Sequence, residues 1–223
     1  MNTVFGEILP LAVAIAISPI PIIATILMLM TPRAKALGFG FLAGWVPGVA
    51  VAVTVFTLLA GVIEEPSTEG SQPVAGVVQV VLGAALLLLA VRQWRHRPRS
   101  SEDVHLPTWM SKIDTMKPGA ALGLAFLLSG INPKNLLLAA SAGTTIGRGG
   151  LDGAQATGII VIFVVLSSLS VGIPVIAYAL APLKAAKVLD VVRSWLAVNN
   201  STIMAVLLLV IGAQLLGKGI GSF

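Results

Sequence analysis

Cysteine is absent from this chain of 223 residues, which excludes disulfide bonds, thiolate metal sites and thiol–disulfide chemistry. Charged residues are scarce as well. They make up 10% of the chain, whereas soluble domains usually contain about 25%. Hydrophobic residues make up 57% of the chain, and the mean hydropathy is +0.98. This composition indicates an integral membrane protein with almost no sequence left for a separate soluble domain.

Side chains for metal binding or catalysis are nearly missing from the apolar segments. Glu7 is the only acidic residue in the expected spans, and His96 and His105 both fall in one polar loop. Metal transport, proton relays and enzymatic chemistry would need carboxylates, histidines or thiolates inside the spans. We therefore expect no metal, no cofactor and no enzyme activity. The chain also lacks a Walker-type G-x-x-x-x-G-K-[ST] loop, so it does not hydrolyse ATP by that route.

Six apolar segments are expected to cross the membrane: residues 4–30, 36–63, 74–91, 120–146, 154–180 and 202–216. Eleven of the fourteen Lys and Arg residues lie in alternate connections, at residues 33–35, 92–117 and 184–193. The positive-inside rule makes these connections cytoplasmic, with the 184–193 segment a basic amphipathic connector at the interface. The acidic residues Glu64, Glu65 and Glu69 then face outside, as do both termini. A juxtamembrane position explains the basic run at 92–99, so we expect no nucleic-acid partner.

The fourth expected span contains the most unusual motif, Ser129-Gly130-Ile131-Asn132-Pro133-Lys134-Asn135. A lysine at membrane depth costs roughly 2.5–3.5 kcal/mol. Pro133 has no N–H and interrupts a continuous helix, and broken backbone inside a bilayer must be buried in protein or line a wet cavity. The half-helix after the break begins beside Lys134 with free N–H groups and a positive dipole end. The motif therefore predicts a site for an anionic or strongly polar group.

The alternative interpretation is two short helices joined at the membrane surface, with Lys134 extending to the interface. Neither apolar flank is long enough to span alone, which favours a break inside the membrane.

An internal repeat relates the two halves of the chain. Ser18-Pro19-Ile20-Pro21 in the first span matches the 129–133 motif with one insertion, and residues 81–86 match residues 210–215. The halves have opposite predicted orientations, which is typical of inverted-repeat transporters whose substrate binds near the midplane. We predict an all-α integral membrane protein with six transmembrane helices in two inverted three-helix repeats, and with helices one and four broken. The first repeat is residues 1–95, the cytoplasmic basic loop is 96–117 and the second repeat is 118–223.

The candidate site consists of polar residues on or near the two breaks. The residues predicted to bind substrate are Ser18, Thr25, Ser129, Asn132, Lys134 and Asn135, and those predicted to break the helices are Pro19, Pro21, Gly130 and Pro133. The hydroxyl residues of the fifth span, Ser167, Ser168 and Ser170, are interpreted mainly as packing residues.

The Ser-Pro-Ile-Pro element, Gly44-Trp45 and the run from Asn132 to Ala139 resemble the lysine exporter superfamily. Within it the chain resembles the GAP or Sap branch, the glycopeptidolipid- and sulfolipid-addressing proteins of mycobacteria and related actinobacteria. The resemblance covers nearly the whole chain and implies export of a cell-envelope lipid or glycolipid across the plasma membrane. The lipid headgroup would bind at the two breaks, with Lys134 pairing a sulfate, phosphate or carboxylate.

Two other functions remain open from the sequence. Export of a small solute such as an amino acid would use Lys134 for the carboxylate, although the spans offer no midplane acid for the amino group. An accessory factor for a larger lipid synthase or exporter would need no transport activity of its own. A second copy of the chain or a lipid-synthesis protein therefore stays open as a partner.

Overall fold

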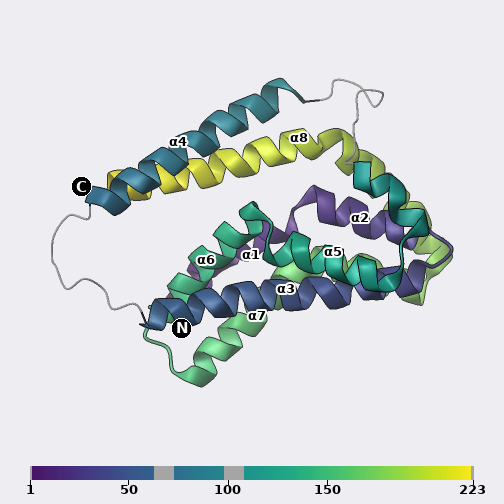
Figure 1. The fold of residues 1–223 in the computed structure, drawn as a ribbon, viewed down its shortest axis with the longest axis horizontal. Coiled ribbons are helices and arrows are strands. Elements are labelled where there is room, and N and C mark those ends of the chain that lie inside the picture. Colours follow the sequence, from purple (N-terminus) through teal and green to yellow (C-terminus); the bar gives the residue numbers. More distant parts are fainter. Residues whose placement is uncertain (1, 63–72, 98–107, 222–223) are drawn as a thin grey trace. The chain divides into compact units, whose positions relative to one another are not determined.

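The computed structural model describes residues 2–62, 73–97 and 108–221. Every element in these ranges is a helix (Figure 1), which confirms the all-α prediction. In chain order the elements are α1 (Asn2–Ala16), α2 (Pro19–Leu29), α3 (Ala34–Val62), α4 (Pro73–Arg95), the 3₁₀ helix η2 (Thr108–Thr115), α5 (Pro118–Gly130), α6 (Pro133–Gly147), α7 (Gly153–Leu180) and α8 (Pro182–Ile220).

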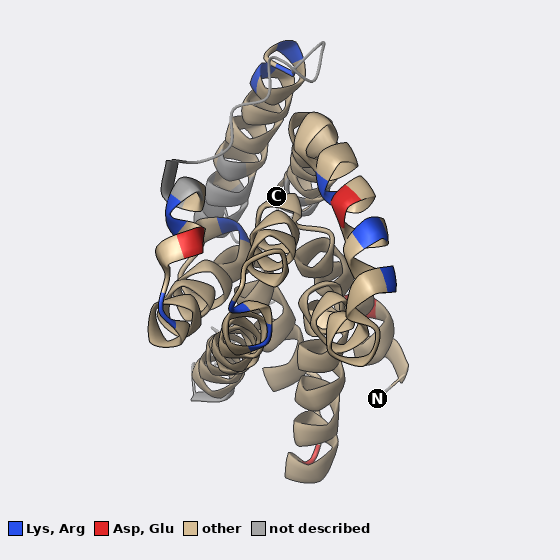
Figure 2. Ribbon diagram, turned by 90° about the vertical axis from the view of Figure 1, so that its right-hand side faces the viewer, with Lys and Arg blue, Asp and Glu red and all other residues tan. Residues whose placement is uncertain are grey.

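Several helices are long and apolar enough to cross a membrane. The described residues contain three such segments, Ala34–Ala60, Gly153–Leu180 and Pro182–Gln214. The number rises to five if each of two bent pairs, α1 with α2 and α5 with α6, forms one span. Figure 2 shows long stretches of these helices without a charged residue. The chain is thus a multi-pass helical membrane protein, while six spans and the orientation of the termini stay predictions.

Both bends fall at the predicted helix breaks. The α1–α2 pair bends by 50° and the α5–α6 pair by 58°. Pro19 and Pro133 are each the first residue of the helix after the break, a position where a missing N–H costs nothing. Pro21 lies in the first turn of α2, where helical N–H groups also have no intrahelical partner. Both prolines are therefore compatible with a helix that begins at Pro19, and neither can donate a hydrogen bond to the helix before the break.

The last helix differs from the prediction. Residues 184–193 were expected to form a connector separate from a final span at 202–216, but α8 runs unbroken from Pro182 to Ile220. Between residues 183 and 211 the sequence has neither Pro nor Gly to end a helix. Asn199, an apparent turn residue, donates its side-chain Nδ2 to Trp195 O at 2.9 Å within the helix. The predicted separate connector is therefore wrong.

The predicted loop at 96–117 is partly ordered. Residues 108–115 form η2, which packs against α2. Met110 and Ile113, one 3₁₀ turn apart, are buried. Residues 98–107, which include Arg99 and His105, lie outside the described ranges, as do Glu64, Glu65 and Glu69 of the predicted outer loop. The cytoplasmic and outer positions of these loops stay predictions.

The chain divides into two compact units that cut across the predicted halves. Unit 1 contains Met1–Glu65 and Leu106–Arg193, and unit 2 contains Pro66–His105 and Ser194–Phe223. Each unit therefore combines segments from both predicted repeats. Unit 1 holds the two broken helix pairs with α3 and α7, and unit 2 holds α4 and the larger part of α8.

Inside unit 1, each long helix packs on the broken pair of the other half. α3 lies along α5 and α6, and α7 lies along α1 and α2. Two glycines let the α3 backbone approach α5 closely. A Cβ built on Gly40 would lie 2.9 Å from Pro118 O, and one on Gly44 would overlap Leu122 O. Trp45 of α3 is completely buried and stacks on Phe41 with ring centroids 6.1 Å apart.

Unit 2 is an antiparallel helix pair. Gly83 of α4 faces Gly212 of α8, and a Cβ on Gly83 would lie 2.9 Å from Gly212 O. Nearer the C-terminal end of α4, Gln93 Nε2 donates to Ser201 Oγ of α8 at 3.3 Å. These two contacts fix which residues of α4 and α8 lie opposite each other.

Candidate functional site

The first helix break leaves the Ala14 carbonyl without its helical partner. In a continuous helix, Ala14 O would accept from Ser18 N. Instead, Ser18 N donates to Ile15 O at 3.2 Å. Ser18 precedes α2 as its N-cap with extended backbone, φ −64° and ψ 112°, and its side chain makes no capping hydrogen bond. The Ala14 carbonyl and the Ser18 hydroxyl are therefore both available to another element.

The second break has the same form but closes locally. Asn132 is the N-cap of α6, and its Oδ1 accepts from Lys134 N at 3.0 Å. Asn132 N donates to Leu127 O at 3.1 Å instead of Leu128 O. The Leu128 carbonyl accepts instead from Asn135 Nδ2 at 3.0 Å. Asn135 is buried, so this amide satisfies a carbonyl that water cannot easily reach.

Lys134 joins the two breaks. Its half-buried ammonium donates to Ala14 O at 2.8 Å and to Ser18 Oγ at 2.5 Å. This lysine in the first turn of α6 thus satisfies the carbonyl that the first break exposes. Both acceptors are neutral, so the positive charge of Lys134 is hydrogen bonded but not neutralised by them.

The other two residues predicted to bind substrate are placed differently. Ser129 is buried and donates to Phe126 O at 3.2 Å, with its side chain against Gly48 of α3. Thr25 is fully buried and donates to Pro21 O at 2.8 Å within α2. It lies two turns beyond Ser18, roughly 10 Å along the helix axis. The structure thus brings together Ser18, Asn132, Lys134 and Asn135 around the breaks, but it does not bring Thr25 to Lys134.

Gly130 serves helix packing more than the bend itself. It is the last residue of α5, and a Cβ there would lie 3.0 Å from Gly48 O. A side chain at Gly130 would push α5 away from α3. The glycine therefore holds the second break against α3, while Pro133 and Asn132 make the turn.

The most important acceptor of the site, the Ala14 carbonyl, is not among the residues predicted from the sequence, because a backbone group leaves no mark in the residue pattern. One indirect signal was available. In a continuous helix the Ala14 carbonyl would accept from Ser18 N, four residues later, and the Ser18-Pro19 junction predicts that the helix ends before this bond can form. Two of the three serines of α7 are placed as packing residues would be, with one additional feature. Ser167 and Ser168 are buried, and within the described part of the chain their hydroxyls have no hydrogen-bond partner.

Chemically, the site offers hydrogen-bond donors and one positive charge inside apolar surroundings. Among residues 2–62, 73–97 and 108–221, no group of three or more His, Cys, Asp or Glu side chains could hold a metal ion. Glu7 of α1 is exposed. The arrangement therefore suits an anionic or hydroxyl-rich group. It defines a multi-pass helical membrane protein in which two bent helix pairs meet at one ammonium group.

The chain belongs to the family described as Sap, sulfolipid-1-addressing protein, whose family model matches residues 8–221. This confirms the resemblance to the Sap branch, while membership of the lysine exporter superfamily stays a prediction. Membership of that family points to a role in lipid export or addressing. Comparison with curated proteins found no significant match, and neither did comparison with solved structures.

Proposed function

We propose that this protein is a non-enzymatic transporter that exports a cell-envelope lipid or glycolipid across the plasma membrane. The lipid headgroup binds where the two helix breaks meet. The observation that carries this proposal is the pair of hydrogen bonds from Lys134 to Ala14 O and Ser18 Oγ, because they place one unneutralised charge between the two halves of the chain. The family match supports a lipid as the substrate.

An inverted repeat of two three-helix halves, with α4 as the third of six spans, is the arrangement that we propose. Three features support it. Ser18 and Asn132 occupy the same N-cap position before a proline. α3 and α7 each pack on the broken pair of the other half. Gly83 and Gly212, which are equivalent in the repeat, pack on each other. Contacts between equivalent residues are expected near a pseudo-two-fold axis.

The charge on Lys134 gives the substrate a way to open the site. A hydrogen bond from an ammonium to a sulfate, phosphate or carboxylate is roughly twice as strong as one between neutral groups. An anionic headgroup can therefore replace both Ser18 Oγ and Ala14 O as the partners of Lys134. That exchange releases the link between α6 and the first break, so substrate binding is coupled to movement of one half relative to the other.

In this proposal the basic connections lie on the cytoplasmic side and both termini lie outside, following the distribution of Lys and Arg.

The family description also favours a second candidate, a factor that delivers the lipid to another exporter, because it names addressing and not transport. Such a factor would bind the headgroup at the same site without moving it across the bilayer.

A translocation assay separates these two functions. The purified chain is reconstituted in phosphatidylcholine vesicles that contain a trace of a fluorescent sulfated glycolipid, and a membrane-impermeant quencher reports its appearance in the outer leaflet. We expect transfer from the inner leaflet to be much faster than in protein-free vesicles, with fluorescent phosphatidylcholine as the control lipid. Transfer at the protein-free rate would contradict direct transport and favour the addressing factor. Release of trapped labelled amino acids would instead show a solute exporter.

A further inference from the structure

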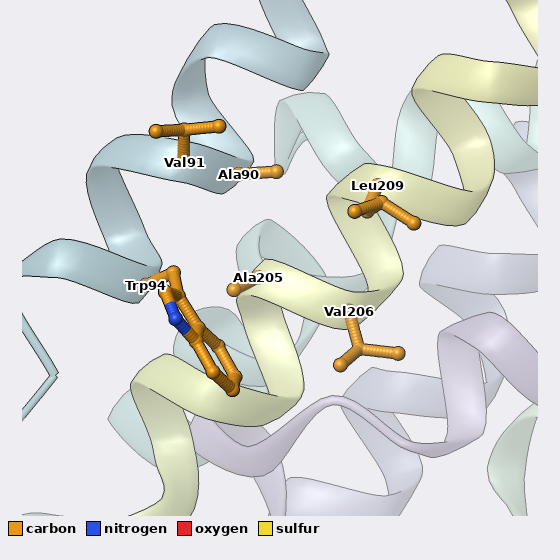
Figure 3. A pocket seen from close by; sticks show the side chains of 6 residues that line it. All are labelled: Ala90, Val91, Trp94, Ala205, Val206 and Leu209. Atoms are coloured by element: carbon orange, nitrogen blue, oxygen red, sulfur yellow. The ribbon is translucent and has the colours of Figure 1, made fainter.

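An apolar groove lies between α4 and α8 within unit 2. Six residues line it, namely Ala90, Val91, Trp94, Ala205, Val206 and Leu209 (Figure 3), and its volume is about 320 Å³. This volume is at the lower end of the range for ligand sites, roughly 300–1,000 Å³. The lining residues offer almost only carbon, so the groove suits a hydrocarbon chain and not a polar solute.

Small residues form the floor of the groove, and larger ones form its walls. Ala90 and Ala205 are 3% and 4% exposed, whereas Trp94, Val206 and Leu209 remain about half exposed, at 46%, 51% and 53%. The contacts at Gly83–Gly212 and Gln93–Ser201 hold the two helices together on either side. Because the side chains of Ala90 and Ala205 are small, the space between these two contacts stays unfilled. The groove therefore depends on one alanine from each helix.

A cluster of positive charge continues the groove at the end of α4. Arg92 and Arg95 lie in the last turn of the helix, and Arg97 lies two residues beyond its end. The Arg97 guanidinium lies 4.2 Å from the centroid of the Trp94 ring and donates to Trp94 O at 3.0 Å. Arg95 follows Val91 by one helical turn, on the same side of α4. All three arginines are exposed and available to an anion.

This combination matches one kind of occupant. Tryptophan is enriched at the depth of lipid headgroups, and juxtamembrane arginines attract anionic lipids. We infer that the groove binds an acyl chain of an anionic phospholipid of the surrounding bilayer, whose phosphate pairs with Arg95 and Arg97. The lipid links α4 to α8 as a bound component of unit 2. This inference does not depend on the proposed export function.

Tryptophan quenching by brominated lipid tests the inference. Trp45, Trp109 and Trp195 are changed to phenylalanine, so that Trp94 is the one fluorophore left of the four tryptophans in the chain. The full-length variant in phosphatidylcholine nanodiscs receives increasing fractions of phosphatidylglycerol or phosphatidylcholine brominated in the acyl chains. We expect half-maximal quenching at a mole fraction at least about fivefold lower for phosphatidylglycerol, because each pairing charge contributes about that factor. Equal quenching by the two lipids would overturn the inference.

Matched variants separate the groove from the charge. Changing both Arg95 and Arg97 to Gln should remove the preference for phosphatidylglycerol, whereas Arg33→Gln, in the turn before α3, should retain it. Ala205→Leu fills the floor of the groove and should also remove the preference. Leu88→Phe adds bulk at a 72% exposed position of α4 outside the groove and should not. A preference that survives Ala205→Leu would show attraction to the arginines alone and overturn the groove as the site.

A second version of the quenching experiment is used if a variant no longer folds. If the triple tryptophan variant or Ala205→Leu melts well below the unmodified protein, quenching is measured in the chain with all four tryptophans. The signal of Trp94→Phe is then subtracted to isolate Trp94. The same fivefold difference between the two lipids is expected, and its absence from the subtracted signal would overturn the inference.

Discussion

Replacing Lys134 by alanine is expected to slow lipid translocation roughly ten- to a hundredfold while the protein remains folded in the membrane. The variant loses the charged partner of the headgroup, and a hydrogen bond to a charged group contributes about 1.5–3 kcal/mol, where each 1.4 kcal/mol is about a factor of ten. It also leaves Ala14 O and Ser18 Oγ without the ammonium that they accept from. The initial rate of transfer of the fluorescent sulfated glycolipid measures the effect.

Two further variants serve as controls for this result. Lys184→Ala removes an exposed lysine near the start of α8 and should leave the rate unchanged. Lys134→Arg keeps the charge but replaces a compact ammonium with a larger, planar guanidinium, so it should retain part of the activity. A rate for Lys134→Ala equal to that of the unmodified protein would remove Lys134 from the transport mechanism.

The largest loss of stability is expected from Gly44→Ala. A Cβ at this position would overlap Leu122 O, a backbone atom of α5 that can move only with its helix. Overpacking of this kind costs typically 1–3 kcal/mol, which lowers the melting temperature of a protein of this size by about 3–10 °C. The melting temperature in detergent, followed by size-exclusion chromatography after heating, measures the change.

Gly123→Ala, on the facing helix α5, is the matched control. A Cβ there meets no atom within 4 Å, and alanine favours the helical conformation by up to about 1 kcal/mol relative to glycine. Gly123→Ala should therefore melt at or above the temperature of the unmodified protein. Equal melting temperatures for the two alanine variants would contradict the close approach of α3 and α5.

The two helix breaks could be predicted from the sequence because proline leaves a specific mark. Pro19 and Pro133 each follow a residue that caps helices well, and each lies within an apolar segment. Lys134, next to Pro133, then indicated that the second break carries a positive charge that needs hydrogen-bond partners. Composition alone was enough for the all-α membrane class.

Other features depend on information that residue patterns do not contain. The continuity of α8 was missed because the charges between Lys184 and Arg193 resemble an interface segment, although nothing in that stretch stops a helix. The partner of Lys134 is partly a backbone carbonyl, which any residue at position 14 would supply. Thr25 was included in the site because it is polar, but its hydroxyl is satisfied one turn back at Pro21 O.

The central claim is that the two breaks meet through Lys134, and cross-linking tests it most directly. Because the chain has no cysteine, the double variant Ser18→Cys, Lys134→Cys carries the only two thiols. A short bifunctional thiol reagent is applied in native membranes. Cleavage at a protease site inserted between α4 and η2 then separates the two halves of every chain that is not cross-linked.

Glu7→Cys with Lys134→Cys is the control, since residue 7 lies roughly 16 Å before residue 18 along the α1 axis. We predict that the halves stay joined after proteolysis with Ser18→Cys and separate with Glu7→Cys, whereas separation in both variants would contradict the meeting of the two breaks.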